Sequence, residues 1–104
     1  MSMVPVYSAS KAALDALTKT MAVEFGKHKV RVVGFNPGGI QTNMYAQLTS
    51  QDAEVMGAYA GRFPLGKSML PMEQVVSTIL FLASGIAGMM TGSSVVLDGG
   101  FLAT

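Results

Sequence analysis

The sequence of 104 residues contains no cysteine and few charged residues (12%), and its formal net charge is only +1. Without cysteine the chain can form neither disulfide bonds nor metal sites built on thiolates, and we predict no metal site. The small net charge gives no sign of a surface that would attract nucleic acid or acidic lipids. Half of the residues are hydrophobic, so the chain has enough apolar surface to offset the entropy lost on folding. The composition therefore predicts a folded domain.

The first residues lack the basic stretch and the long apolar run of a secretory signal, so we predict a cytoplasmic protein. The stretch 74–97 contains no charged residue and is about as long as a membrane-spanning helix (~20 residues). Gly85, Gly88 and Gly92 interrupt it. We therefore expect a buried helix, a loop and a buried strand here, and no membrane span.

The hydrophobic pattern predicts helices at 5–25 and 71–84 and strands at 30–35 and 94–97, all within one partial domain covering residues 1–104. Both strands are continuous apolar runs joined through a helix, which is typical of a parallel sheet in an α/β fold. Two strands do not make a stable parallel sheet, so further strands must pair with them. The long connection 36–70, with one short helix expected near 53–61, has the length of a binding loop or lid.

Tyr7 and Lys11 lie four residues apart in the first predicted helix, so their side chains share one face about one turn apart. A lysine ammonium close to a phenol favours the phenolate, which would make the tyrosine a reversible proton donor. The same spacing fits a tyrosine that packs and a lysine that is solvated beside Asp15. Spacing alone favours this second interpretation.

The strand predicted at 30–35 is followed by the sequence NPGGIQT at 36–42. Ligands of open α/β sheets bind beyond the carboxyl ends of the strands. Gly38 and Gly39 would let the backbone approach such a ligand closely, and Thr42 supplies a hydroxyl group. An ordinary turn at the end of a strand explains these residues equally well.

Several motifs together resemble the C-terminal half of the short-chain dehydrogenase/reductase family. They are the tyrosine and lysine of YSASK, the NPG at 36–38, the PGxxxT at 37–42, the PLGK at 64–67 and the TG…DGGF at 91–101. They occur in the family's order and spacing over nearly the whole chain. RFPLGK, VVSTILFLAS and the closing GGF most resemble the L-xylulose (dicarbonyl) reductases of this family. The resemblance implies the C-terminal portion of a Rossmann-type doubly wound parallel sheet, and an NAD(P)-dependent reduction of a small ketone, dicarbonyl or ketose.

The resemblance also implies roles for single residues. Tyr7 would donate a proton to the substrate carbonyl oxygen, while Lys11 would favour the phenolate and hydrogen-bond the nicotinamide ribose. Tyr7 and Lys11 would contact the cofactor together with four further residues: Pro37, Gly38, Ile40 and Thr42. The implied cofactor is NADP, with NAD as the alternative. The complete enzyme would be a homodimer or homotetramer.

Parts of the family's active site are missing from the sequence. No glycine-rich dinucleotide-binding turn precedes Tyr7, and the family's catalytic serine and asparagine also belong upstream. We therefore expect the N-terminal βαβ nucleotide-binding half to be absent and the isolated chain to be inactive. The alternative is a short noncatalytic product that docks on full-length subunits. Asp98 has no neighbouring carboxylate in the sequence, and we expect it to stabilise the closing turn rather than to act as an acid.

Overall fold

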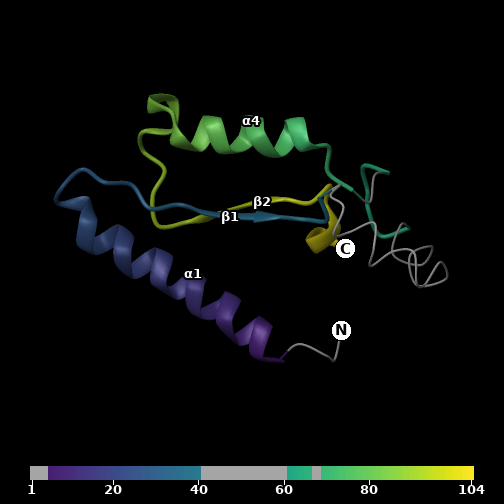
Figure 1. Cartoon of the computed structure of the whole chain (residues 1–104), viewed down its shortest axis with the longest axis horizontal. Coiled ribbons are helices and arrows are strands. Elements are labelled where there is room, and N and C mark those ends of the chain that lie inside the picture. The colour runs from purple at the N-terminus through teal and green to yellow at the C-terminus, as the bar shows by residue number, and fades with distance from the viewer. Residues whose placement is uncertain (1–4, 41–60, 67–68) are drawn as a thin grey trace. The chain divides into compact units, whose positions relative to one another are not determined.

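The structure is a computed structural model that describes residues 5–40, 61–66 and 69–104 (Figure 1). Its elements are α1 (Pro5–Gly26), β1 (Gly34–Pro37), α4 (Met72–Ala83) and β2 (Ser94–Leu97), with short 3-10 helices at Gly85–Ala87 and Phe101–Ala103. The chain divides into two compact units. The helix unit comprises Met1–Gly34 and Leu82–Val95, and the turn unit comprises Phe35–Phe81 and Val96–Thr104.

α1 begins at Pro5 and ends at Gly26, one residue beyond the helix predicted at 5–25. Proline is favourable in the first turn because an N–H group there would have no partner within the helix. After the helix, the N–H of Lys29 donates to the carbonyl oxygen of Gly26 (2.9 Å). Lys29 has a φ of 59°, in the left-handed region, and this turns the chain away from the helix axis.

β1 and β2 pair as a two-stranded sheet. The N–H of Gly34 donates to the carbonyl oxygen of Ser93 (2.9 Å), and the N–H of Gly38 donates to that of Leu97 (2.8 Å). The pairing advances in the same direction along both strands, so the pair is parallel. α4 lies between the strands in the chain and provides the crossover that a parallel pair requires. The predicted α/β class is therefore confirmed.

The strand predicted at 30–35 was placed too early, because β1 covers Gly34–Pro37. Val32 does form hydrogen bonds: its N–H donates to Oγ1 of Thr91 (3.0 Å), and its carbonyl accepts from the N–H of Gly92 (2.8 Å). Gly92, however, has a φ of 75°, so the chain opposite Val32 is not extended and does not continue the ladder. The run of β-branched residues indicated that this segment is partly buried. It could not indicate where the neighbouring strand begins.

α4 covers Met72–Ala83, within the predicted range 71–84. Pro71 precedes it, and its carbonyl oxygen accepts from the N–H groups of Gln74 (3.1 Å) and Val75 (3.4 Å). Glu73 lies in the first turn, where its negative charge complements the helix dipole. In the part of the chain that the structure describes, no helix is long and apolar enough to cross a membrane.

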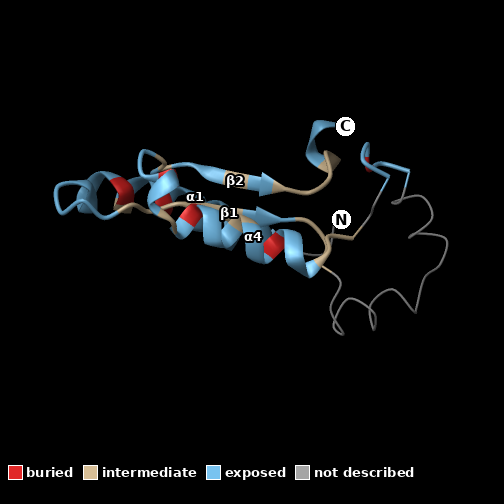
Figure 2. Ribbon diagram, turned by 90° about the horizontal axis from the view of Figure 1, so that it is seen from above, coloured by how far each residue is buried: buried red, intermediate tan, exposed pale blue. Residues whose placement is uncertain are grey.

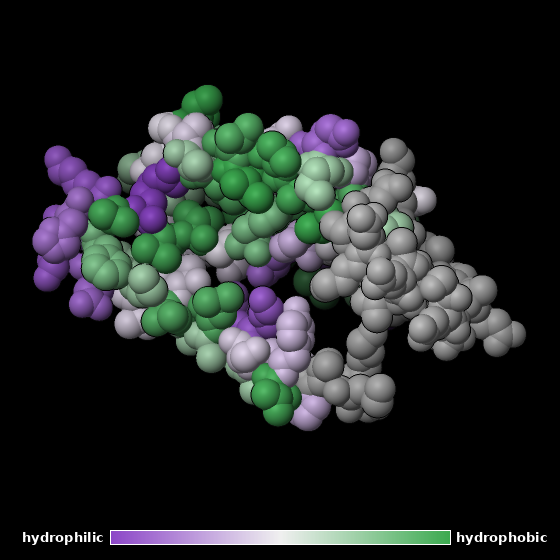
Figure 3. Space-filling view, viewed as in Figure 1, coloured by the Kyte–Doolittle hydropathy of each residue, from purple (hydrophilic) through white to green (hydrophobic). Residues whose placement is uncertain are grey.

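Few of the described residues are buried (Figure 2). The buried residues are Thr18, Ala22, Phe63, Val75, Leu82 and Ala87. Large apolar side chains remain accessible on α4, where Val76, Ile79 and Leu80 are 46%, 47% and 64% exposed. Hydrophobic residues accordingly lie open on the surface in Figure 3. Apolar surface of this extent is suited to further packing.

Three sequence predictions concern residues outside the described ranges: the role of Thr42, the short helix near 53–61 and most of the connection 36–70.

Candidate active site

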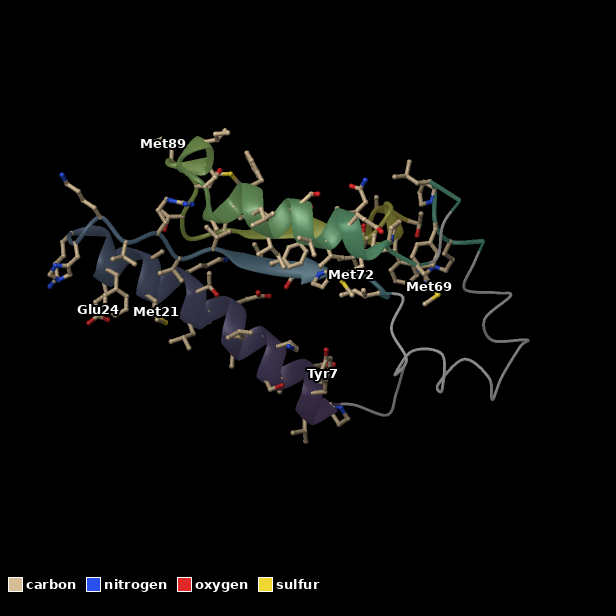
Figure 4. The ribbon with its side chains drawn as sticks, turned by 45° about the horizontal axis from the view of Figure 1, so that its top comes forward. Tyr7, Met21, Glu24, Met69, Met72 and Met89 are labelled. Carbon is tan, nitrogen blue, oxygen red and sulfur yellow. The ribbon has the colours of Figure 1, made fainter. Side chains whose placement is uncertain are left out.

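Tyr7 and Lys11 lie one turn apart in the first turns of α1, and Figure 4 labels Tyr7 at that end of the helix. The Nζ atom of Lys11 lies over the Tyr7 ring, 5.5 Å from its centre. An ammonium group in this position is attracted by the negative face of the ring. Tyr7 is 58% exposed, so the residue is accessible to a ligand. The helix thus brings the ring of a tyrosine and a positive charge together.

The hydroxyl group of Ser10 is used within the same turn. Its Oγ donates to the carbonyl oxygen of Tyr7 (2.7 Å). A serine bonded to its own helix in this way satisfies a backbone acceptor locally. Ser10 is therefore a structural neighbour of the pair and not a third member of it.

Gly38 stands directly after β1, where the sequence predicted close approach of the backbone to a ligand. A Cβ atom added to Gly38 would lie 3.2 Å from both the Cα and the Cβ of Asp98. This contact is tighter than ordinary van der Waals packing, so a larger residue would push Asp98 away. The close approach of Asp98 therefore accounts for a glycine at position 38 without any ligand.

The residues that follow are held by the segment that leads into α4. The N–H of Leu70 donates to the carbonyl oxygen of Gly39 (2.7 Å), and Ile40 and Leu70 form a parallel bridge. Pro37 is exposed, while Gly38, Gly39 and Ile40 are half-buried. The backbone that follows β1 is therefore held by the segment before α4, and its residues are glycines or apolar.

Asp98 holds the closing turn, as predicted from the sequence. Its Oδ1 accepts from the N–H of Gly100 (2.9 Å) and its Oδ2 from the N–H of Leu102 (3.0 Å). Gly99 and Gly100 have φ values of 64° and 89°, which side chains other than glycine rarely adopt. Both carboxylate oxygens thus serve the backbone of the turn.

Arg31 has a structural role that sequence reasoning missed. Its guanidinium donates to the carbonyl oxygens of Leu82 (2.8 Å), Ser84 (3.1 Å) and Met90 (3.3 Å). Two of these carbonyls lie at the end of α4, where the last turn leaves acceptors without partners in the helix. A positive charge is also favourable at this negative end of the helix dipole. An arginine within the β-branched run VRVV was the available signal, because a half-buried charge needs partners.

An aromatic cluster in the turn unit was also missed. Phe63 is buried, and its ring centre lies 5.0 Å from that of Phe101. The guanidinium of Arg62 lies 4.5 Å from the centre of the Phe101 ring. The N–H of Leu65 donates to the carbonyl oxygen of Gly99 (3.3 Å). These contacts attach residues 61–66 to the C-terminal residues.

The structure thus brings Tyr7 and Lys11 together in the helix unit, and separately brings Pro37, Gly38 and Ile40 together in the turn unit. Among the described residues, no three histidine, aspartate or glutamate side chains gather in a way that could hold a metal ion.

Known proteins resemble this chain over nearly all of its length. The family described as enoyl-(acyl carrier protein) reductase matches residues 1–102. L-xylulose reductase of Bos taurus is 50% identical over 99 residues, which are 95% of this chain and 40% of the bovine protein. Carbonyl reductase [NADPH] 2 of Sus scrofa is 42% identical over 98 residues, or 94% of this chain and 39% of the pig protein. The chain therefore spans about two fifths of the length of these relatives.

A solved structure agrees with these matches. The crystal structure of a short-chain type dehydrogenase/reductase from Mycobacterium marinum superposes with a TM-score of 0.81 at 39% sequence identity, covering 94% of this chain and 37% of the other. The likeness extends the α/β assignment to a fold of the Rossmann type. Together with the family match over residues 1–102, it shows that the chain belongs to the short-chain dehydrogenase/reductase family.

Proposed function

We propose that this chain is the C-terminal part of an NAD(P)-dependent reductase in which Tyr7 protonates the carbonyl oxygen of a small substrate. The observation that carries the proposal is the Lys11 ammonium group, 5.5 Å from the centre of an exposed tyrosine ring. The same two residues are the catalytic pair that the family resemblance implied.

The proposed reaction converts a carbonyl group into an alcohol. A nicotinamide cofactor, when bound, would supply a hydride for the carbonyl carbon. As the new C–H bond forms, the π electrons of the carbonyl group move to its oxygen atom, and Oη of Tyr7 gives that oxygen a proton. The positive charge of Lys11 stabilises the phenolate left on Tyr7 until a proton from solvent restores the phenol.

The small and apolar residues at the end of β1 support a nicotinamide site there. Pro37 offers an exposed apolar ring, Gly38 and Gly39 have no side chain, and Ile40 adds a half-buried apolar group. These residues follow the carboxyl end of a parallel strand, where α/β sheets bind ligands. We propose that Pro37, Gly38 and Ile40 line the nicotinamide and that Thr42 contacts its carboxamide or the pyrophosphate.

We propose NADP as the cofactor, with NAD as the alternative to be tested beside it. The pig relative is a carbonyl reductase that carries NADPH in its name. For the substrate we propose a small ketone, a dicarbonyl or a ketose such as L-xylulose, supported by 50% identity with bovine L-xylulose reductase. We further propose a cytoplasmic homodimer or homotetramer for the complete enzyme.

A second candidate function is that of a noncatalytic short product that docks on full-length subunits. The exposed apolar side chains of α4, among them Ile79 and Leu80, favour it because they offer surface for packing. Both candidates share the expectation that the 104-residue chain alone does not turn over carbonyl substrates. They differ in whether its residues can catalyse when the rest of a reductase is present.

A chimaera distinguishes the two candidates. This chain would replace the matching part of bovine L-xylulose reductase, and NADPH oxidation would be followed with diacetyl and with L-xylulose. We expect turnover with NADPH, slower turnover with NADH, and none from the isolated chain. A folded chimaera without activity would favour the noncatalytic candidate, and activity of the isolated chain would overturn our proposal that it lacks essential parts.

A further inference from the structure

Five residues of α1 share one face of the helix: Tyr7, Lys11, Asp15, Thr18 and Ala22. Their successive spacings of four, four, three and four keep side chains in one row. At one end of the row Thr18 and Ala22 are buried, whereas at the other end Tyr7 is 58% exposed. The face that carries the candidate catalytic pair is therefore the face by which the C-terminal half of α1 packs.

The C-terminal half of α1 packs closely, but through apolar contacts that have no directional preference. A Cβ atom added to Gly92 would lie 3.4 Å from the Cβ of Ala22, so helix and loop are in van der Waals contact. The hydroxyl group of Thr18 donates to the carbonyl oxygen of Leu14 (2.9 Å) and so stays within the helix. Apolar contact of this kind holds α1 in place without fixing how its N-terminal half projects.

A directed bond is found one turn beyond Lys11. Oγ of Ser94, the first residue of β2, donates to Oδ1 of Asp15 (3.1 Å). All described residues of α1 before Thr18 are exposed. The bond to Ser94 therefore ties this exposed stretch of the helix to the beginning of a strand.

Gly34, the first residue of β1, leaves room for this bond. A Cβ atom added there would overlap Oγ of Ser94 and lie 3.2 Å from its Cβ. The serine hydroxyl could avoid such a side chain only by rotating away. The glycine thus lets Ser94 keep the rotamer that reaches Asp15.

We propose that Asp15 and Ser94 are positioning residues, whose hydrogen bond fixes the direction in which the turn carrying Tyr7 and Lys11 projects. Both residues are exposed, so the hydrogen bond adds little to folding stability. Its effect is on the orientation of the first turns of α1. The importance of that orientation rests on the proposed function, but the orientation itself is measurable without any activity.

The test uses spin labels on the 104-residue chain, which is cysteine-free and therefore needs no background substitutions. Val6→Cys and Met89→Cys place nitroxides on two exposed positions of the helix unit. Double electron–electron resonance then gives the distribution of distances between them. We expect a narrow distribution that Asp15→Ala, Ser94→Ala and Gly34→Ala each shift or broaden. Asp15→Asn keeps an acceptor and Ser94→Thr keeps a donor, so the distance distribution should stay narrow in each of these two variants.

The matched control is Glu24→Ala, which removes a carboxylate from the same helix nine residues further on and should leave the distribution narrow. Circular dichroism of every variant shows whether the helix content is unchanged. A broad distribution in the starting chain would overturn the inference, as would equal broadening by Glu24→Ala or no change with Asp15→Ala and Ser94→Ala. Such a result leaves the proposed function standing, because that proposal fails only if the folded chimaera is inactive.

Discussion

The guanidinium of Arg31 donates to the carbonyl oxygen of Leu82, 51 residues away in the sequence, at 2.8 Å. The same side chain also reaches Ser84 and Met90. One arginine thus satisfies three acceptors at and beyond the end of α4. A lysine could not present the same fork of donors.

We expect Arg31→Met to lower the free energy of unfolding by about 1–3 kcal/mol, because it removes charge-assisted hydrogen bonds to three backbone carbonyl oxygens. Arg31→Lys should recover only part of this loss. Urea unfolding followed by circular dichroism measures both values. Lys19→Met, a charge removal at an exposed position of α1, is the control and should change stability by less than about 0.5 kcal/mol. A cost for Arg31→Met no larger than that of the control would contradict the assignment.

Gly38→Ala should destabilise the chain by about 1–3 kcal/mol, since the new methyl group meets the backbone of Asp98 at 3.2 Å. Gly26→Ala is the matched control, because its added Cβ meets nothing within 4 Å apart from its chain neighbours and the backbone of its own helix. There the substitution should be neutral or stabilising by up to about 1 kcal/mol. Urea unfolding compares the two variants, and equal effects would refute the close approach of Asp98.

The contacts of Phe101 predict two coupling energies. A double-mutant cycle of Phe63→Ala and Phe101→Ala should give about 0.5–1.5 kcal/mol, as for other aromatic pairs. A cycle of Arg62→Ala and Phe101→Ala should give about 0.5–1 kcal/mol, the size of an exposed cation–π contact. Arg62→Lys keeps the charge and should keep part of that coupling. If the changes in the free energy of unfolding were additive in both cycles, these side chains would not interact in solution.

Local features of the sequence predicted local features of the fold. The helix predicted at 5–25 agrees with α1 within one residue. The spacing of Tyr7 and Lys11 placed both side chains on one face, because four residues make about one turn of a helix. Asp98 was expected to stabilise the closing turn because no other carboxylate lies near it in the sequence, and its hydrogen bonds confirm this.

The features that were missed depend on partners far away in the chain. β1 starts at Gly34 and not at Val30 because Gly92, more than 50 residues later, bends the chain that would have been its partner. The contacts of Arg31 and of Phe101 likewise join separate segments. Hydrophobic periodicity reports how a segment is buried, but it does not report which residues it meets.

If Tyr7 donates the proton, removing its hydroxyl group should slow the reaction strongly. In the chimaera with bovine L-xylulose reductase, Tyr7→Phe should reduce kcat for diacetyl by about 10²–10⁴-fold, the usual contribution of general acid catalysis. Ser10→Ala removes a neighbouring hydroxyl that donates to the backbone and should change kcat little. A Tyr7→Phe chimaera with the kcat of its parent would contradict the account.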